Sequence, residues 1–135
     1  MGRLIDTSVF IDLERKGSHV SDLGEWLPDE PAMMAAMSAS ELLVGMHRAE
    51  TPQRREERKA FIDDVFEFAV VLPFDLDVAR RHARLWAELS GAGQLIGAHD
   101  LIIAATALAH DHSVLTLNMR DFDRVPGLIT IKPDW

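Results

Sequence analysis

Leu4-Ile5-Asp6-Thr7-Ser8-Val9, near the start of the sequence, is the most informative stretch for the fold. Together with Arg3, its first two residues form a short strand, and a helix is predicted directly after the acid, over residues 7–14. An unpaired charge directly after an apolar strand is costly in free energy, so a carboxylate at this place indicates a function. The stretch therefore predicts a strand–helix unit with a candidate site residue, Asp6, at its junction.

Short apolar runs and helical patterns alternate along the rest of the chain, which is typical of an α/β fold with a mostly parallel sheet. Further strands are predicted at residues 33–37, 69–72, 113–117 and 128–131. Helices are predicted at residues 20–27, 38–49, 78–89 and 101–109, and another helix starts at Thr51-Pro52. We expect one domain, residues 1–135, folded as a three-layer α/β/α sandwich around a four- or five-stranded sheet.

Three local patterns describe the helices more closely. Ser38 and Glu41 match a capping box, with Ser38 as the N-cap. The helix after Pro52 carries an apolar stripe made of Ala60, Phe61, Val65 and Phe66. The stretch 101–109 is apolar at every position except Thr106, so this helix should be buried on nearly all sides.

The composition limits the kinds of site that the chain can form. It has 135 residues, an ordinary size for one domain, and no cysteine, which excludes disulfides and thiolate–zinc sites. Its six histidines form no HExxH or similar zinc pattern. Any metal must therefore be held mainly by oxygen, which favours Mg²⁺ or Mn²⁺.

The charge argues against a protein that binds nucleic acid by charge alone, because the formal net charge is −8. Two basic clusters exist, and each is equally well interpreted as a solvated helix face paired with neighbouring acids. They consist of Arg54, Arg55, Arg58 and Lys59, and of Arg80, Arg81 and Arg84. No apolar run is long enough for a transmembrane helix and no secretory signal is recognisable, so a cytoplasmic location without membrane contact is expected.

Acidic residues from distant parts of the chain are predicted to meet at one edge of the sheet. Asp6, Glu41 and Asp121 each follow a predicted strand, and Asp100 stands at the start of a buried helix. Sites in open parallel sheets form outside the carboxyl ends of the strands. Close carboxylates repel one another unless a divalent cation joins them, and that arrangement suits phosphodiester hydrolysis. Taken singly, Glu41 and Asp100 are equally typical of helix caps or dipole partners.

Polar side chains around these acids are predicted to orient them. They are Thr7, Ser8, Ser38, Thr116 and Asn118.

Four stretches of the sequence resemble the motifs of PIN-domain nucleases, in the form found in VapC-type toxins. They are Leu4-Ile5-Asp6-Thr7-Ser8-Val9, then Ser40-Glu41-Leu42-Leu43-Val44-Gly45, then Gly93-Gln94-Leu95-Ile96-Gly97-Ala98-His99-Asp100-Leu101-Ile102-Ile103-Ala104-Ala105, and finally Leu115-Thr116-Leu117-Asn118-Met119-Arg120-Asp121-Phe122 with Val125-Pro126-Gly127-Leu128. They occur in the order of the family and cover essentially the whole chain. One departure is Leu95, which stands where many relatives have proline.

The resemblance implies an activity and its residues. PIN nucleases cleave RNA with Mg²⁺, for which Mn²⁺ is a possible substitute, and leave a 5′-phosphate and a 3′-hydroxyl. The active-site acids map to Asp6, Glu41, Asp100 and Asp121, which are also the implied metal ligands. Asp123 competes with Asp121 for the fourth place, and the pattern Asn-x-x-Asp-Phe favours Asp121.

The resemblance also implies partners. VapC-type toxins cut structured RNA, commonly tRNA or ribosomal RNA, and so inhibit translation. They are usually homodimers that a cognate VapB-type antitoxin neutralises. The apolar groove for such an antitoxin is expected to involve Val9, Phe10, Leu13, Leu43 and Met46, for which the alternative is an ordinary place in the core.

Two other functions stay open from the sequence. The first is a nuclease acting on DNA or a small nucleotide, since metal-bound carboxylates do not recognise the sugar. The second is a catalytically inactive interaction module. The pair His99-Asp100 is superficially similar to HD-type phosphohydrolases, but the rest of that ligand set is missing, so His99 is expected at the helix start or the rim of the site.

Overall fold

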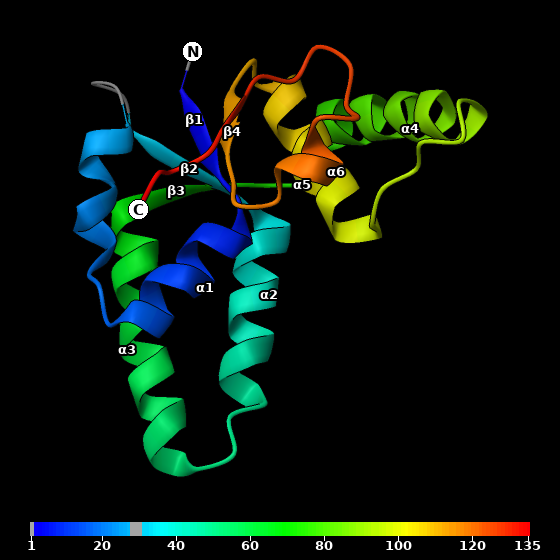
Figure 1. Cartoon of the computed structure of the whole chain (residues 1–135). Coiled ribbons are helices and arrows are strands. Elements are labelled where there is room, and N and C mark those ends of the chain that lie inside the picture. The colour runs from blue at the N-terminus through cyan, green and yellow to red at the C-terminus, as the bar shows by residue number, and fades with distance from the viewer. Residues whose placement is uncertain (1, 28–30) are drawn as a thin grey trace.

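The computed structural model describes residues 2–27 and 31–135, and its strands form a five-stranded parallel sheet (Figure 1). The strands are β1 (Arg3–Ile5), β2 (Ala32–Ala35), β3 (Ala69–Leu72), β4 (Ser113–Leu115) and β5 (Thr130–Ile131), in the order β3-β2-β1-β4-β5. Every neighbouring pair is parallel. The predicted α/β sandwich with a parallel sheet is therefore confirmed.

Helices cover both faces of this sheet. They are α1 (Thr7–Lys16), the 3₁₀ helix η1 (Val20–Trp26), α2 (Ala36–His47), α3 (Pro52–Phe68), α4 (Leu76–Gly91), α5 (Ala98–Ala109) and the short α6 (Met119–Phe122). Figure 1 shows α1, α2 and α3 together on one side of the molecule and α4, α5 and α6 on the other. In the described ranges no helix has both the length and the apolar character needed to cross a membrane.

Alternation along the strands divides the core into two layers, because successive side chains of a strand point to opposite faces. Ile5 and Leu115 pack with residues of α1, α2 and α3, whereas Leu4 and Val114 pack with residues of α4 and α5. All four side chains are fully buried. The strands next to the site are thus anchored on both faces, which gives their carboxyl ends a rigid support.

The order of the strands reverses beside β1. The chain runs from β1 outward through β2 to β3 and then returns to place β4 on the free side of β1. Such a reversal leaves a crevice at the carboxyl ends of the two central strands, where open parallel sheets bind their ligands. Asp6 directly follows β1 and Thr116 directly follows β4, so both lie at this crevice.

The capping-box prediction is wrong. The helix α2 begins at Ala36, directly after β2, and its N-cap is Ala35 without a side-chain cap. Ser38 therefore lies inside the helix, where it is completely buried. No loop separates β2 from α2, so the helix starts without an exposed turn in which a serine could serve as N-cap. For the same reason, the last two residues of the predicted strand 33–37 belong to the helix.

The apolar stripe of α3 is also partly wrong. Ile62 and Val65 are the buried residues of this helix, whereas Ala60 is exposed and Phe66 is 37% exposed. Successive residues of a helix are rotated by about 100° around its axis, so Ile62 and Val65 lie on the same face of α3 and Ala60 lies on the opposite face. The face with Ile62 and Val65 packs toward α2 and η1.

Other differences concern the ends of elements. The helices α1, α4 and α5 are longer than predicted, and β4 and β5 are shorter. The stretch 20–27 forms the 3₁₀ helix η1 in place of an α-helix, and the predicted stop at Pro28 lies outside the described residues. The burial predicted for α5 is confirmed, since six of its residues, including Thr106, are buried.

Phe122 anchors α6 in the core, because its side chain is fully buried among residues of α4 and α5. Phe122→Ala should lower the free energy of unfolding by about 3–5 kcal/mol through the lost burial and the cavity left behind. Ile129→Ala is the control, since Ile129 is 54% exposed and its truncation should cost no more than about 0.5 kcal/mol. Urea denaturation measures both, and equal losses would contradict the packing described for α6.

Candidate active site

Asp6 is the buried centre of the site, with 3% of its surface exposed. Its Oδ2 accepts hydrogen bonds from Ser8 Oγ at 2.6 Å and from Thr116 Oγ1 at 2.9 Å. The two hydroxyl oxygens in turn accept from the backbone N–H groups of Leu117, at 3.1 Å, and Asn118, at 2.8 Å. This network joins the β1–α1 junction to the loop after β4 and orients the carboxylate of Asp6.

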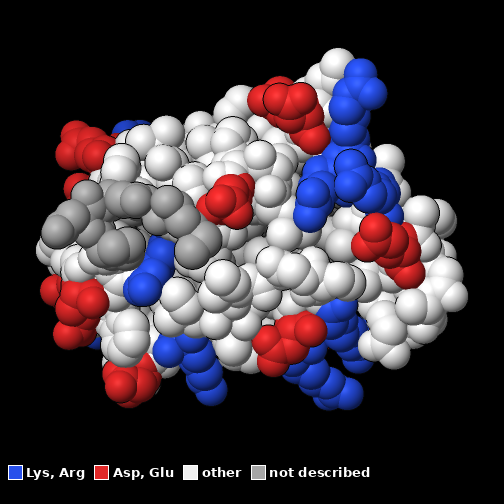
Figure 2. Space-filling model, turned by 90° about the horizontal axis from the view of Figure 1, so that it is seen from above, with Lys and Arg blue, Asp and Glu red and all other residues white. Residues whose placement is uncertain are grey.

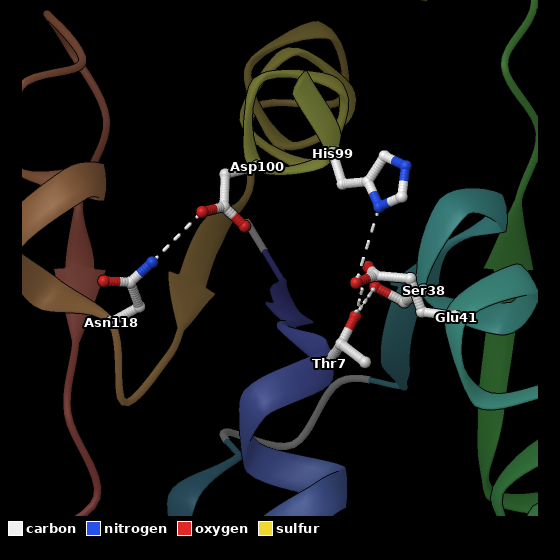
Figure 3. Close-up of polar contacts among 6 residues, drawn as sticks. All are labelled: Thr7, Ser38, Glu41, His99, Asp100 and Asn118. Carbon is white, nitrogen blue, oxygen red and sulfur yellow. Dashed lines mark hydrogen bonds and ion pairs between the residues drawn. The ribbon is translucent and has the colours of Figure 1, made fainter. Parts of the chain in front are cut away.

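Glu41 reaches the site from the second turn of α2 (Figure 3). Thr7 Oγ1 donates to Glu41 Oε1 at 2.9 Å and lies 2.8 Å from the Oγ of the buried Ser38. The other carboxylate oxygen, Oε2, lies 3.6 Å from His99 Nδ1 of α5. Side chains from α1, α2 and α5 thus hold Glu41 in place.

Asp100 and Asp121 are joined by one amide. Asn118 Nδ2 donates to Asp100 Oδ2 at 3.0 Å and to Asp121 Oδ2 at 3.2 Å. Asp100 lies in the first turn of α5, where the helix dipole favours a negative charge, and Asp121 lies in α6. The amide of Asn118 keeps the two carboxylates at the same edge of the crevice.

The charges of the other three acids act on Asp100. The pKa of Asp100 is raised to about 6, first by burial and then by the charges of Asp6, Asp121 and Glu41, while the hydrogen bond from Asn118 opposes the rise. Like charges act in this way only when they are close together and not neutralised. Three acids that lie far from Asp100 in the sequence, Asp6, Glu41 and Asp121, are therefore near enough in the fold to raise its pKa.

The structure places Asp121 and Asp123 in different surroundings. Asp121 shares Asn118 with Asp100, whereas Asp123 Oδ1 accepts from Thr130 Oγ1 at 2.9 Å in an exposed position. The predicted orienting residues Thr7, Ser8, Ser38, Thr116 and Asn118 all contact one of the acids or the hydrogen-bond network around them. The sequence analysis placed His99 at the helix start or the rim of the site, and its contact with Glu41 was not predicted.

The donor set suits a divalent cation with oxygen ligands. Carboxylates are the ligands that Mg²⁺ and Mn²⁺ prefer, and a cation among them would offset the repulsion that Asp100 experiences. In the part of the chain that the structure describes, no group of three or more acids or histidines is already arranged to hold a metal ion. Several carboxylate oxygens instead accept from the hydroxyl and amide donors around them, so binding requires these side chains to adjust.

A groove of about 750 Å³ opens beside Glu41, between α1, α2 and α3. Its apolar lining includes Phe10, Ile11, Leu42, Phe61 and Ile62, and Glu41 forms part of its wall. Among the residues predicted for an antitoxin groove, Phe10 lines this one, although it is also fully buried in the core. Val9 and Leu13 are buried in the core, and Leu43 and Met46 pack against it, so the alternative interpretation holds for these four.

The fold and the acidic crevice together define a class of protein. A family profile described as "PIN domain" matches residues 3–128. Ribonuclease VapC1 of Rickettsia felis is 39% identical over 128 residues, which are 95% of this chain and 93% of that relative. The tRNA(fMet)-specific endonuclease VapC of Salmonella typhimurium is 26% identical over 93% of this chain and 92% of its own length.

Solved structures agree with this similarity. VapBC-5 from Mycobacterium tuberculosis, a member of the VapBC family of toxin–antitoxin systems, matches with a TM-score of 0.73 and 32% identity, over 96% of this chain and 94% of that one. VapBC2 from Rickettsia felis, solved bound to a DNA fragment from its promoter, matches with a TM-score of 0.85 over 98% of both chains; at 21% identity this likeness concerns the fold alone. The chain therefore belongs to the PIN-domain family, in its group of VapC-type ribonucleases.

Repulsion among the acids predicts how stability depends on pH. Since the pKa of Asp100 is about 6 in the folded chain against 3.8 ordinarily, folding takes up a proton between these values. The stability of the metal-free protein should therefore fall as the pH rises from about 4 to about 6, and stay lower above that. In chelator at neutral pH, Asp100→Asn should raise the free energy of unfolding by about 1–2 kcal/mol, which is less than the full pKa shift implies because Asp100 is partly exposed to solvent. Below about pH 4 the substitution should not change the free energy of unfolding.

Thermal unfolding in chelator, with Asp123→Asn as the control, measures this effect. Adding Mg²⁺ should then stabilise the wild type more than Asp100→Asn. A variant that is less stable than the wild type in chelator at neutral pH would show that the four carboxylates do not repel one another.

Proposed function

We propose that the chain is a Mg²⁺-dependent endoribonuclease toxin of the cytoplasm that cleaves structured RNA and thereby inhibits translation. The observation that carries this proposal is the hydrogen-bond network at the crevice between β1 and β4, in which Thr116 binds Asp6 and Asn118 binds both Asp100 and Asp121. The names of the similar proteins support RNA as the substrate, and the Salmonella relative supports tRNA as the first RNA to test, before ribosomal RNA.

Asp6, Glu41, Asp100 and Asp121 are the proposed metal ligands and active-site acids. The divalent cation, when bound, supplies Lewis-acid stabilisation of the charge that develops on the phosphate oxygens. The surrounding donors orient the acids, since Ser8 and Thr116 bind Asp6 and Thr7, itself in contact with Ser38, binds Glu41. Asn118 keeps Asp100 and Asp121 at the same edge of the crevice, so the cation needs only local adjustments of these side chains to bind.

The basic side chains outside the crevice differ in their availability to RNA. Arg58 donates to the backbone oxygen of Gly45 at 2.6 Å and lies 3.8 Å from Glu14, so its place is structural. Arg80, Arg81 and Arg84 of α4 have no ion-pair partner within the described ranges. Figure 2 shows a dense group of basic side chains on the side of the molecule where α4 lies in Figure 1. These arginines suit a large, structured RNA that extends past the crevice.

A cognate VapB-type antitoxin is the proposed inhibitor, and the active form is proposed to be a homodimer. The groove between α1, α2 and α3 has both apolar and charged side chains in its lining, with Phe10, Ile11 and Phe61 among the apolar ones and Glu41 among the acids. A peptide seated there could place an arginine or lysine against the acids, where it would compete with the cation for the same oxygens. The similar structures, which contain toxin–antitoxin pairs, support this partner.

The first test of the activity compares two neighbouring acids. Asp121→Asn should lower RNA cleavage by at least about 100-fold, because a charge that holds the cation is lost. Asp123→Asn should leave cleavage unchanged, since its carboxylate is bound to Thr130 away from the crevice. Sequencing of RNA 5′-ends after brief expression identifies the target, and purified protein with and without Mg²⁺ then gives the rates. Equal rates for both variants would refute the assignment of Asp121, and DNA cleavage without RNA cleavage would refute the substrate.

The second test concerns the antitoxin. Co-expression with the neighbouring small open reading frame should yield a complex in which RNA cleavage is lost. Ile11→Asp, which replaces an apolar lining residue of the groove with a charge, should abolish the complex, whereas Leu76→Asp should not, since Leu76 is 65% exposed and outside the groove. A complex that still cleaves RNA would contradict the toxin–antitoxin proposal and leave the nuclease proposal intact.

A further inference from the structure

Two of the basic side chains that line the groove between α1, α2 and α3 have no acidic partner. Arg15 and Arg54 are exposed, and neither forms an ion pair within the described ranges. Glu57, which follows Arg54 by three residues, accepts a hydrogen bond from Gln53 at 3.4 Å instead. The other basic lining residues are paired, Arg58 with Glu14 at 3.8 Å and His19 with Asp64 at 3.6 Å. The groove thus presents two positive charges that no ion pair neutralises.

Arg15 lies at the end of the groove that is far from Glu41. It follows Thr7, whose hydroxyl donates to Glu41, by eight residues of the same helix. At 1.5 Å per residue, this is a distance of about 12 Å along α1. Its neighbour Glu14 contacts Arg58 of α3, so this end of α1 lies against α3.

Arg54 lies at the same end of the groove, on the wall formed by α3. The helices α2 and α3 run side by side in opposite directions (Figure 1), and they are level where Arg58 donates to the backbone oxygen of Gly45. Gly45 is about 6 Å along α2 from Glu41, and Arg54 is about 6 Å further in the same direction along α3 from Arg58. Arg54 is therefore also about 12 Å from Glu41 along these helices.

We propose that Arg15 and Arg54 bind a side-chain carboxylate, of Asp or Glu, in the antitoxin segment that occupies the groove. This inference rests on the proposed antitoxin and adds a second charge by which the groove selects it. A basic residue of the segment against Glu41 and an acidic residue about 12 Å further on match the two ends of the groove. That spacing corresponds to about four residues of an extended peptide or about eight residues of a helix.

The lining of the groove favours a peptide over RNA at these arginines. Its apolar part, which includes Ile11 and Phe61, suits the apolar side chains of a peptide. An RNA strand would instead place its phosphates against Glu14, Glu57 and Asp64, and such contacts between like charges are unfavourable. Guanidinium groups bind a carboxylate through two parallel hydrogen bonds, so the match also discriminates against segments without an acid at this place.

The experiment measures, by calorimetry, the affinity of the full-length protein for the product of the neighbouring small open reading frame. Arg15→Glu and Arg54→Glu should each weaken binding by about 10- to 100-fold, because a hydrogen-bonded ion pair is replaced by two like charges. Arg55→Glu is the matched control, since Arg55 is the exposed neighbour of Arg54 and does not line the groove. It carries the same change of charge and should alter the affinity by no more than about twofold.

An exchange of charges identifies the acid of the partner. Each Asp and Glu of the small protein is replaced in turn by Lys. One of these variants should bind Arg54→Glu more tightly than it binds the wild type, because the exchange restores a pair of opposite charges at the same place. Thermal melting followed by circular dichroism verifies that each variant is folded.

The outcomes separate this inference from the proposed function. If the wild type forms no complex, the proposed antitoxin is refuted together with the inference. If the complex forms but Arg54→Glu and Arg55→Glu weaken it equally, or no Lys variant restores binding to Arg54→Glu, the inference is overturned and the antitoxin stands. Slower RNA cleavage by free Arg54→Glu, with an unchanged affinity for the small protein, would assign this arginine to the substrate and also overturn the inference.

Discussion

The burial of the Asp6 carboxylate governs how the active-site edge of this protein is built. A charge that is 3% exposed at the end of a central strand must find hydrogen-bond donors, and the hydroxyls of Ser8 and Thr116 provide them. Those hydroxyls come from α1 and from the loop after β4, so satisfying one carboxylate fixes the distance between two parts of the chain that are more than a hundred residues apart. The same loop carries Asn118, and through Asn118 the position of Asp6 is linked to Asp100 and Asp121.

The crevice works against the stability of the folded chain. The pKa of Asp100 is raised first by burial and then by the charges of Asp6, Asp121 and Glu41, so its ionised form is disfavoured in the folded chain. The fold tolerates it because the strands beneath are anchored in two apolar layers, one against α1, α2 and α3 and the other against α4 and α5. Acidic side chains held close together by a rigid apolar core suit a divalent cation, because the bound cation would neutralise their negative charges.

Glu41 takes part in three features of the molecule. It is an acid of the crevice, it forms part of the wall of the groove between α1, α2 and α3, and its Oε2 lies 3.6 Å from Nδ1 of the exposed His99. A partner in the groove would therefore act directly on an active-site side chain, without any change in the fold. In the proposed scheme, inhibition and cation binding both act through this one carboxylate.

The order of apolar and polar residues along the chain was enough to predict the class of fold and the candidate acids. The alternation of strands and helices predicted the parallel sheet, and the place of Asp6 after an apolar strand marked the edge where a site would form. Ends of elements were less predictable: Ser38 satisfies the capping pattern of residues 38–41, yet it is buried, because β2 passes into α2 without a turn. The folded chain was needed to show that Asp121 rather than Asp123 faces the crevice, by way of Asn118, and that His99 lies against Glu41. These contacts depend on how α2, α5 and α6 are placed by packing on the sheet, and packing joins residues that no local pattern relates.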